Sequence, residues 1–178
     1  LDPITAATSA TPAQVAIVSV RGDARQRNSA STRRVSITTD RRSARAPAEP
    51  GGELDTLLIA VEHDLWVLMA ELATNPERRR RGKPGQSLVT AEMVTTLEVR
   101  IDEVMSRFDP PTDFVVPGAN PVCAALDVAR TVVRRAERAA MSTAAEGSHV
   151  LPYLNRCSDL LWALARWQEG TSLLAKDV

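Results

Sequence analysis

Two arginines four residues apart, Arg130 and Arg134, are the residues whose type and spacing most directly suggest chemistry. Residues three and four apart are neighbours on a helix surface, so these arginines share one stripe with Asp127 and Glu137. Two exposed like charges at this spacing repel each other by about 0.2–0.5 kcal/mol. A helix that carries them therefore either pairs them with acids or presents them to an anion.

The element that must position these arginines is a long helix within residues 114–138, which read FVVPGANPVCAALDVARTVVRRAER. A short apolar, strand-like run ends at Pro117 and Gly118, and the helix is predicted from about 120 to 141. Its other faces are apolar, which predicts that they pack on neighbouring elements. These apolar positions are Val122, Ala125, Leu126, Ala129, Val132, Val133 and Ala136.

Three further amphipathic helices are predicted from leucine- and valine-rich stripes at three-four spacing, over residues 51–75, 90–109 and 151–169. Thr90 is a good N-cap residue for the second of them. Short loops between long amphipathic helices favour an antiparallel bundle. The predicted fold is all-α, with four to five helices in residues 51–170 and a short tail over 171–178.

Residues 1–50 differ from the bundle because they are rich in Ala, Ser, Thr, Pro and Arg and lack aromatic residues. Such a composition indicates an irregular arm, in which only residues 15–20 form a candidate strand. Residues 78–81, four consecutive arginines, are interpreted as a solvated surface run, with phosphate binding as the minor alternative.

Composition excludes several classes of function. The 22 basic and 22 acidic residues balance, which argues against nucleic-acid binding, and no apolar run reaches the ~20 residues of a membrane span. Cys123 and Cys157 are expected to be reduced and buried, and His63 and His149 lack metal-ligand spacing. The chain start has no signal-peptide pattern, so a cytoplasmic protein without a protein-held metal is expected.

Several ordered segments resemble the PduO-type ATP:cob(I)alamin adenosyltransferases. The segments are FVVPG, LDVARTVVRRAER and YLNRCSDLLWALAR, and the resemblance extends over residues 51–168. It implies a homotrimer of helical bundles with active sites between subunits, and the substrates cobalamin and ATP with Mg²⁺. It also implies that a cobalt(I) corrinoid attacks C5′ of ATP and releases triphosphate, a step that needs no protein base.

The resemblance also implies roles for individual residues. Arg130 and Arg134 would be the catalytic arginines, and Phe114 would pack against the corrinoid. The expected ATP-binding residues are Gly22, Asp23, Arg34, Arg130, Arg134, Glu137, Arg138 and Asn155. Arginine suits such a site because it offers permanent charge and directional donors to a leaving triphosphate.

The amino-terminal segment departs from the family pattern, which reads approximately TRTGDxGxTxL. Arg25 replaces its second glycine, Arg27 a threonine, and Ile37 a later lysine, while Asp127 replaces a helix histidine. Side chains at glycine positions hinder the approach of backbone N–H groups to phosphate. Three explanations stay open: a divergent working site, a noncatalytic corrinoid- or nucleotide-binding relative, or an amino-terminal sequence translated in the wrong frame.

Structural roles compete with these functional ones. Arg130, Arg134, Asp127 and Glu137 would form ordinary surface ion pairs, each worth about 0–1 kcal/mol. The tryptophans Trp162 and Trp167 are interpreted as packing residues of the bundle or trimer, and not as ligand platforms. On the fourth helix, Asn155, Asp159 and Arg166 are predicted to form the polar side.

Overall fold

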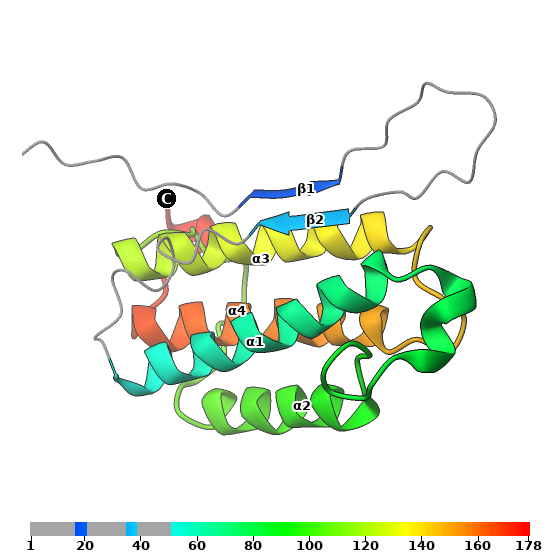
Figure 1. Ribbon diagram of the computed structural model, residues 1–178. Coiled ribbons are helices and arrows are strands. Elements are labelled where there is room, and N and C mark those ends of the chain that lie inside the picture. Colours follow the sequence, from blue (N-terminus) through cyan, green and yellow to red (C-terminus); the bar gives the residue numbers. More distant parts are fainter. Residues whose placement is uncertain (1–16, 21–34, 39–50) are drawn as a thin grey trace, which may run out of the picture.

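A computed structural model describes residues 17–20, 35–38 and 51–178 of the chain, shown in Figure 1. Four long helices dominate these residues, as the sequence predicts. The elements, in chain order, are β1 (Ile17–Val20), β2 (Val35–Thr38), α1 (Glu53–Ala73), the 3-10 helix η1 (Pro76–Arg81), α2 (Ala91–Met105), α3 (Pro121–Ala140), α4 (Val150–Glu169) and the 3-10 helix η2 (Ala175–Asp177).

Helix α4 is the central element of the bundle, because α1, α2 and α3 all contact it. The four helices run side by side in Figure 1. Burial follows this arrangement: α4 carries buried residues on almost every turn, from Val150 through Tyr153 and Leu160 to Arg166. Burying apolar surface at about 25 cal/mol per Å² is the main stabilising term for such a core. The predicted all-α bundle is confirmed.

Two helix starts are fixed by side-chain caps. The Thr90 hydroxyl accepts a hydrogen bond from the backbone N–H of Met93 at 3.3 Å, which confirms the predicted start of α2. The Asn120 side chain caps α3 by accepting from the N–H of Cys123 at 3.0 Å, and Pro121 occupies the first helical turn. Such caps satisfy backbone donors that have no partner inside the helix.

A two-stranded antiparallel ladder precedes the bundle, with Ile17 opposite Thr38 and Val20 opposite Val35. β1 contacts α3 and β2 contacts α1, so the ladder lies along one side of the bundle (Figure 1). β1 falls within the candidate strand of residues 15–20. β2 was not predicted, because a four-residue strand is too short for alternation to stand out in an irregular composition.

The tail is tied back to the FVVPG segment. The N–H of Val116 donates to the Leu173 carbonyl at 2.8 Å, and the N–H of Ala175 donates to the Phe114 carbonyl at 2.7 Å. The Lys176 ammonium adds an ion pair with Asp113 at 3.4 Å. The strand-like run predicted at 114–116 is thus hydrogen-bonded to residues 173–175 of the tail. These bonds hold the backbone of Phe114 from one side.

Both cysteines are free and buried, as predicted. Burial raises the pKa of the Cys157 thiol to about 12, and burial also raises the pKa of Cys123. Among the described residues, no helix is long and apolar enough to cross a membrane.

Candidate functional site

Helix α3 presents its arginines because its apolar positions face α4. Leu126, Val133 and Ala136 are buried, whereas Arg130 and Arg134 lie on the exposed side of the helix. The predicted stripe is therefore real. The two arginines nevertheless have different surroundings: one is paired with an acid, and the other is left available to an anion.

Arg134 has an acidic partner. Its guanidinium Nη1 lies 2.8 Å from Glu137 Oε2, and the other oxygen of Glu137 accepts from Asn155 Nδ2 at 3.0 Å. Arg156 in turn donates to Asn155 Oδ1 at 2.6 Å and pairs with Asp159 at 3.1 Å. Glu137 thus orients an arginine of α3 and an asparagine of α4 together, and three residues predicted for ATP binding form one polar cluster.

Arg130 has no ion-pair partner among residues 51–178. Asp127, one turn before it, pairs with Arg166 at 3.0 Å instead. The positive charge of Arg130 is therefore not balanced by an acid within this part of the chain. An unbalanced guanidinium with five N–H donors is well suited to bind an anion.

The prediction that Arg166 lies on the polar side of α4 is wrong. The spacing on α4 places it on the polar side with Asn155 and Asp159, but in the structure it is only 2% exposed. Its Nη2 pairs with Asp127, and its Nε lies 2.9 Å from Oε2 of Glu169, whose side chain is fully buried. Arg166 is buried because two carboxylates from different helices compensate its charge.

A cavity of about 550 Å³ joins this buried cluster to the surface. Arg130, Asp127 and Arg166 line one part, and the aromatic residues Phe114 and Trp162 line another. The remaining lining residues are Pro111, Thr112, Asp113, Val115 and Pro117. Its size falls within the 300–1,000 Å³ typical of small-molecule sites.

Phe114 is 84% exposed, which is unusual for a large aromatic side chain. Its backbone is held by the tail, so the side chain is displayed on an anchored strand. The phenylalanine of the FVVPG segment thus borders the same cavity as Arg130.

The structure brings some predicted residues together and leaves others apart. Arg134, Glu137 and Asn155 form one cluster, and Arg130 and Phe114 share one cavity. Arg138 lies on the exposed side of α3. The predicted ATP ligands Gly22, Asp23 and Arg34 lie outside the described residues.

Two lining residues were not predicted. Trp162, interpreted from the sequence as a packing residue only, borders the cavity and also packs on Phe108 with ring centroids 6.5 Å apart. Arg166 was assigned to a solvated face. The signal in the sequence that could have indicated its burial was Asp127 on α3, because an acid on the facing helix can pair with a buried cation.

No group of His, Cys, Asp and Glu that could hold a metal ion occurs among the described residues. The carboxylates nearest the arginines, Asp127 and Glu137, are already engaged by Arg166 and by Arg134 with Asn155. The cavity is therefore lined chiefly by arginines, aromatic rings and neighbouring apolar residues.

Comparison with known proteins gives a consistent result. The family described as Cobalamin adenosyltransferase matches residues 14–168, which includes both strands as well as the bundle. Corrinoid adenosyltransferase PduO of Salmonella typhimurium is 37% identical over 118 residues, which are 65% of this chain and 34% of that protein. The chain thus spans about a third of the length of that relative. The Corrinoid adenosyltransferase of Mycobacterium tuberculosis is 37% identical over 129 residues, 70% of this chain and 66% of that protein.

Solved structures agree with these sequence matches. A phenylalanine-to-alanine variant of a PduO-type ATP:corrinoid adenosyltransferase from Lactobacillus reuteri, complexed with cobalamin and ATP, superposes with a TM-score of 0.65 at 25% identity. The match covers 75% of this chain and 76% of that one. An arginine-to-lysine variant complexed with ATP gives a TM-score of 0.62. From its fold, its motifs and these matches, the chain belongs to the PduO-type cobalamin adenosyltransferase family.

Proposed function

We propose that this protein transfers the 5′-deoxyadenosyl group of ATP to cob(I)alamin, giving adenosylcobalamin and triphosphate. The observation that carries the proposal is the shared cavity of Arg130 and Phe114, in a chain of this family. The cavity offers a cationic side to a polyphosphate and an aromatic side to a flat corrinoid ring. The two substrates are those with which a related Lactobacillus reuteri protein is complexed, cobalamin and ATP.

The reaction requires charge stabilisation more than proton transfer. The cobalt(I) electron pair forms the Co–C5′ bond while the C5′–O bond of ATP breaks, and triphosphate leaves with that bond's electrons. Cobalt is formally oxidised from I to III and the carbon is correspondingly reduced. Negative charge grows on the leaving oxygen, so an oriented guanidinium nearby lowers the barrier. In this proposal Arg130 and Arg134 supply that stabilisation.

Glu137 and Asn155 are proposed to set the orientation of Arg134. The carboxylate of Glu137 binds Arg134 on one oxygen and Asn155 on the other, which fixes two potential phosphate or ribose contacts relative to each other. A donor held in place before the reaction needs no reorganisation when charge develops. Arg138, on the same helix, is proposed as a peripheral phosphate contact.

Phe114 is proposed to pack against the corrinoid. Its exposed ring, together with Trp162, Val115 and Pro117 in the same lining, gives an apolar surface next to the cavity. An apolar wall at the cobalt favours a low-coordinate metal that is easier to reduce. Corrinoid chemistry then supplies the nucleophile, while the protein supplies position and electrostatics.

The rest of the ATP site is proposed to come from the amino-terminal segment and from a neighbouring subunit. Gly22, Asp23 and Arg34 occupy positions where the family binds nucleotide, and β1 contacts α3, which carries the arginines. Mg²⁺ would be bound by the triphosphate itself and accompany ATP. A homotrimer with sites between subunits is the proposed assembly.

One alternative has an observation of its own. Arg25, Arg27 and Ile37 replace residues of the family's phosphate-binding pattern, which favours a bundle that binds corrinoid or nucleotide without transfer. The family model nevertheless matches from residue 14 onward, a range that includes this segment.

A single incubation separates the two functions. Purified protein, ATP, Mg²⁺ and chemically reduced cobalamin are mixed without oxygen, and adenosylcobalamin is followed by its absorbance. The proposed function predicts repeated turnover and equal amounts of triphosphate. Retained corrinoid binding without any product would establish the alternative.

A further inference from the structure

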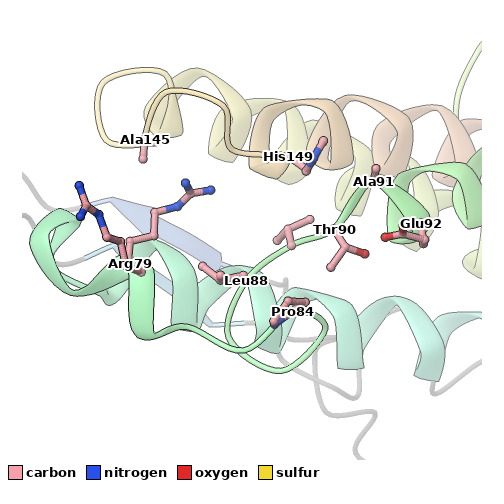
Figure 2. Close-up of a pocket in the computed structure, with 10 residues that line it drawn as sticks. Arg79, Pro84, Leu88, Thr90, Ala91, Glu92, Ala145 and His149 are labelled. Carbon is pink, nitrogen blue, oxygen red and sulfur yellow. The ribbon is translucent and has the colours of Figure 1, made fainter.

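A second cavity, of about 730 Å³, lies at the other end of α4. Figure 2 shows it between the segment that leads into α2 and the loop that leads into α4. At 1.5 Å per residue along α4, His149 at this cavity is about 25 Å from Arg166 at the first one. Its lining residues are Arg79, Arg80, Pro84, Leu88, Val89, Thr90, Ala91, Glu92, Ala145 and His149.

The walls of this cavity are held by one buried carboxylate, Glu71, which is 5% exposed. Glu71 Oε1 accepts from Arg79 Nη2 at 2.8 Å and from the Ser148 hydroxyl at 2.6 Å. Its Oε2 accepts from the backbone N–H of Val89 at 2.6 Å. Three chain segments that border the cavity are thus fixed to one side chain of α1. The shape of the cavity is therefore fixed by these hydrogen bonds to Glu71.

One end of the cavity is cationic. Arg79 and Arg80 both line it, and Arg78 and Arg81 flank them on η1. Glu71 compensates the charge of Arg79, but within residues 51–178 no acid pairs with Arg80, which is exposed. Four adjacent arginines with one acidic partner in the described part of the chain leave a local excess of positive charge there, which attracts anions.

The other end has a different polarity. Figure 2 places Arg79 at one end and Glu92 with Thr90 at the other, with Leu88 between them. A hydrogen bond from its own backbone N–H, and then one from Thr90, hold the pKa of Glu92 below its ordinary value. Glu92 is thus negative at neutral pH, repels an anion at this end and accepts hydrogen bonds from hydroxyl or amino groups.

We propose that this cavity binds a small phosphorylated organic molecule, with its phosphate at Arg79 and Arg80 and its hydroxyl or amino groups at Thr90 and Glu92. The arginine-rich end favours a phosphate dianion over a singly charged group. The apolar stretch at Leu88, Val89 and Ala91 covers the carbon skeleton. The volume is far larger than inorganic phosphate needs, which points to an organic phosphate.

The test is residue-resolved NMR on the full chain, with ribose 5-phosphate as the probe and ribose and inorganic phosphate at equal ionic strength as comparisons. Ribose 5-phosphate is expected to shift the amide signals of Leu88, Ala145 and His149. Replacing Arg80 removes a charged hydrogen-bond donor, so Arg80→Gln is expected to weaken binding about tenfold. Arg78→Gln, an equal charge change on η1 outside the lining, is expected to change it less than about twofold.

Three outcomes would overturn the proposal. One is no shift at these amides with about 10 mM probe, where even a ligand with a Kd near 1 mM is mostly bound. A second is an equal effect of the Arg78 and Arg80 variants, which would indicate surface charge alone. The third is shifts confined to α3 around Arg130 and Arg134. None of these outcomes depends on adenosyl transfer, so the inference stands or fails separately from the proposed function.

Discussion

Removing the buried arginine of α4 should destabilise the protein severely. Arg166 is 2% exposed and pairs with Asp127 and Glu169, whose side chains are 15% and 0% exposed. The substitution Arg166→Met keeps a similar volume but leaves two carboxylates without their cation. Breaking a buried pair by removal of one partner costs about 3–5 kcal/mol.

This loss is large against the total stability of about 5–15 kcal/mol that is typical of a domain. The assay is urea unfolding followed by circular dichroism, since urea, unlike guanidinium, does not screen charges. The expected result is a free energy of unfolding lowered by about 3 kcal/mol or more. Adding Asp127→Asn to the variant should recover part of the loss, because it removes one uncompensated charge.

The matched control is Arg100→Met, which breaks an exposed pair with Glu103 on α2, with side chains 49% and 46% exposed. That change should cost no more than about 1 kcal/mol. Equal losses in the two variants, or a loss below about 1 kcal/mol for Arg166→Met, would show that Arg166 is not a buried charge that compensates Asp127 and Glu169.

Three further predictions follow from burial and exposure. Phe114→Ala should change the free energy of unfolding by less than about 0.5 kcal/mol, because the ring is 84% exposed, while adenosyl transfer falls; a large stability loss in urea would show that the ring packs instead. Glu71→Gln should cost about 2–3 kcal/mol in the same assay, because it weakens charged hydrogen bonds to Arg79 and Val89, whereas Glu103→Gln at an exposed site should be nearly neutral; similar values for both would contradict the role given to Glu71. Burial raises the pKa of Cys157 from its ordinary value of 9.0 to about 12, so the folded protein holds the thiol proton more tightly than the unfolded chain does. Its contribution to stability is therefore complete below about pH 9 and is lost as the pH rises toward 12. Across this pH range the free energy of unfolding should fall more steeply for the wild type than for Cys157→Ala, which has no thiol to titrate. Equal slopes for the two proteins would argue against this role of Cys157.

The sequence predicts the helices of this protein well because their signals are local. Three-four periodicity and a capping threonine at position 90 depend only on residues within a few turns of one another, and the structure confirms both. β2 has no such signal, since four residues give too little alternation and its pairing with β1 is a contact between two separate segments.

In the site, too, the sequence predicts what depends on one helix and misses what depends on contacts between helices. The stripe of Arg130, Arg134 and Glu137 follows from helix geometry and is present. Arg166 looks solvent-exposed on its own helix, and its burial depends on the carboxylate of Asp127 on α3 as well as on Glu169 of α4. Such pairing between helices is a tertiary property that periodicity within one helix does not contain.

The roles of the two arginines also separate only in the structure. At the sequence level, Arg130 and Arg134 are equivalent cations four residues apart. In the structure Glu137 compensates Arg134, whereas Asp127 is engaged by Arg166 and leaves Arg130 to the cavity. The proposed division, with one arginine oriented and one left to bind an anion, is a consequence of which acid reaches which helix.

The proposed transfer and the role of Arg134 in it are tested together by comparing the wild type with Arg134→Ala under saturating ATP and reduced cobalamin. Arg134 belongs to an exposed pair, so the variant should unfold within about 1 kcal/mol of the wild type. The proposed mechanism predicts adenosylcobalamin and triphosphate in equal amounts from the wild type, and a rate lower by about a hundredfold or more in the variant. A wild type that forms no adenosylcobalamin, or a folded variant with an unchanged rate, would contradict it.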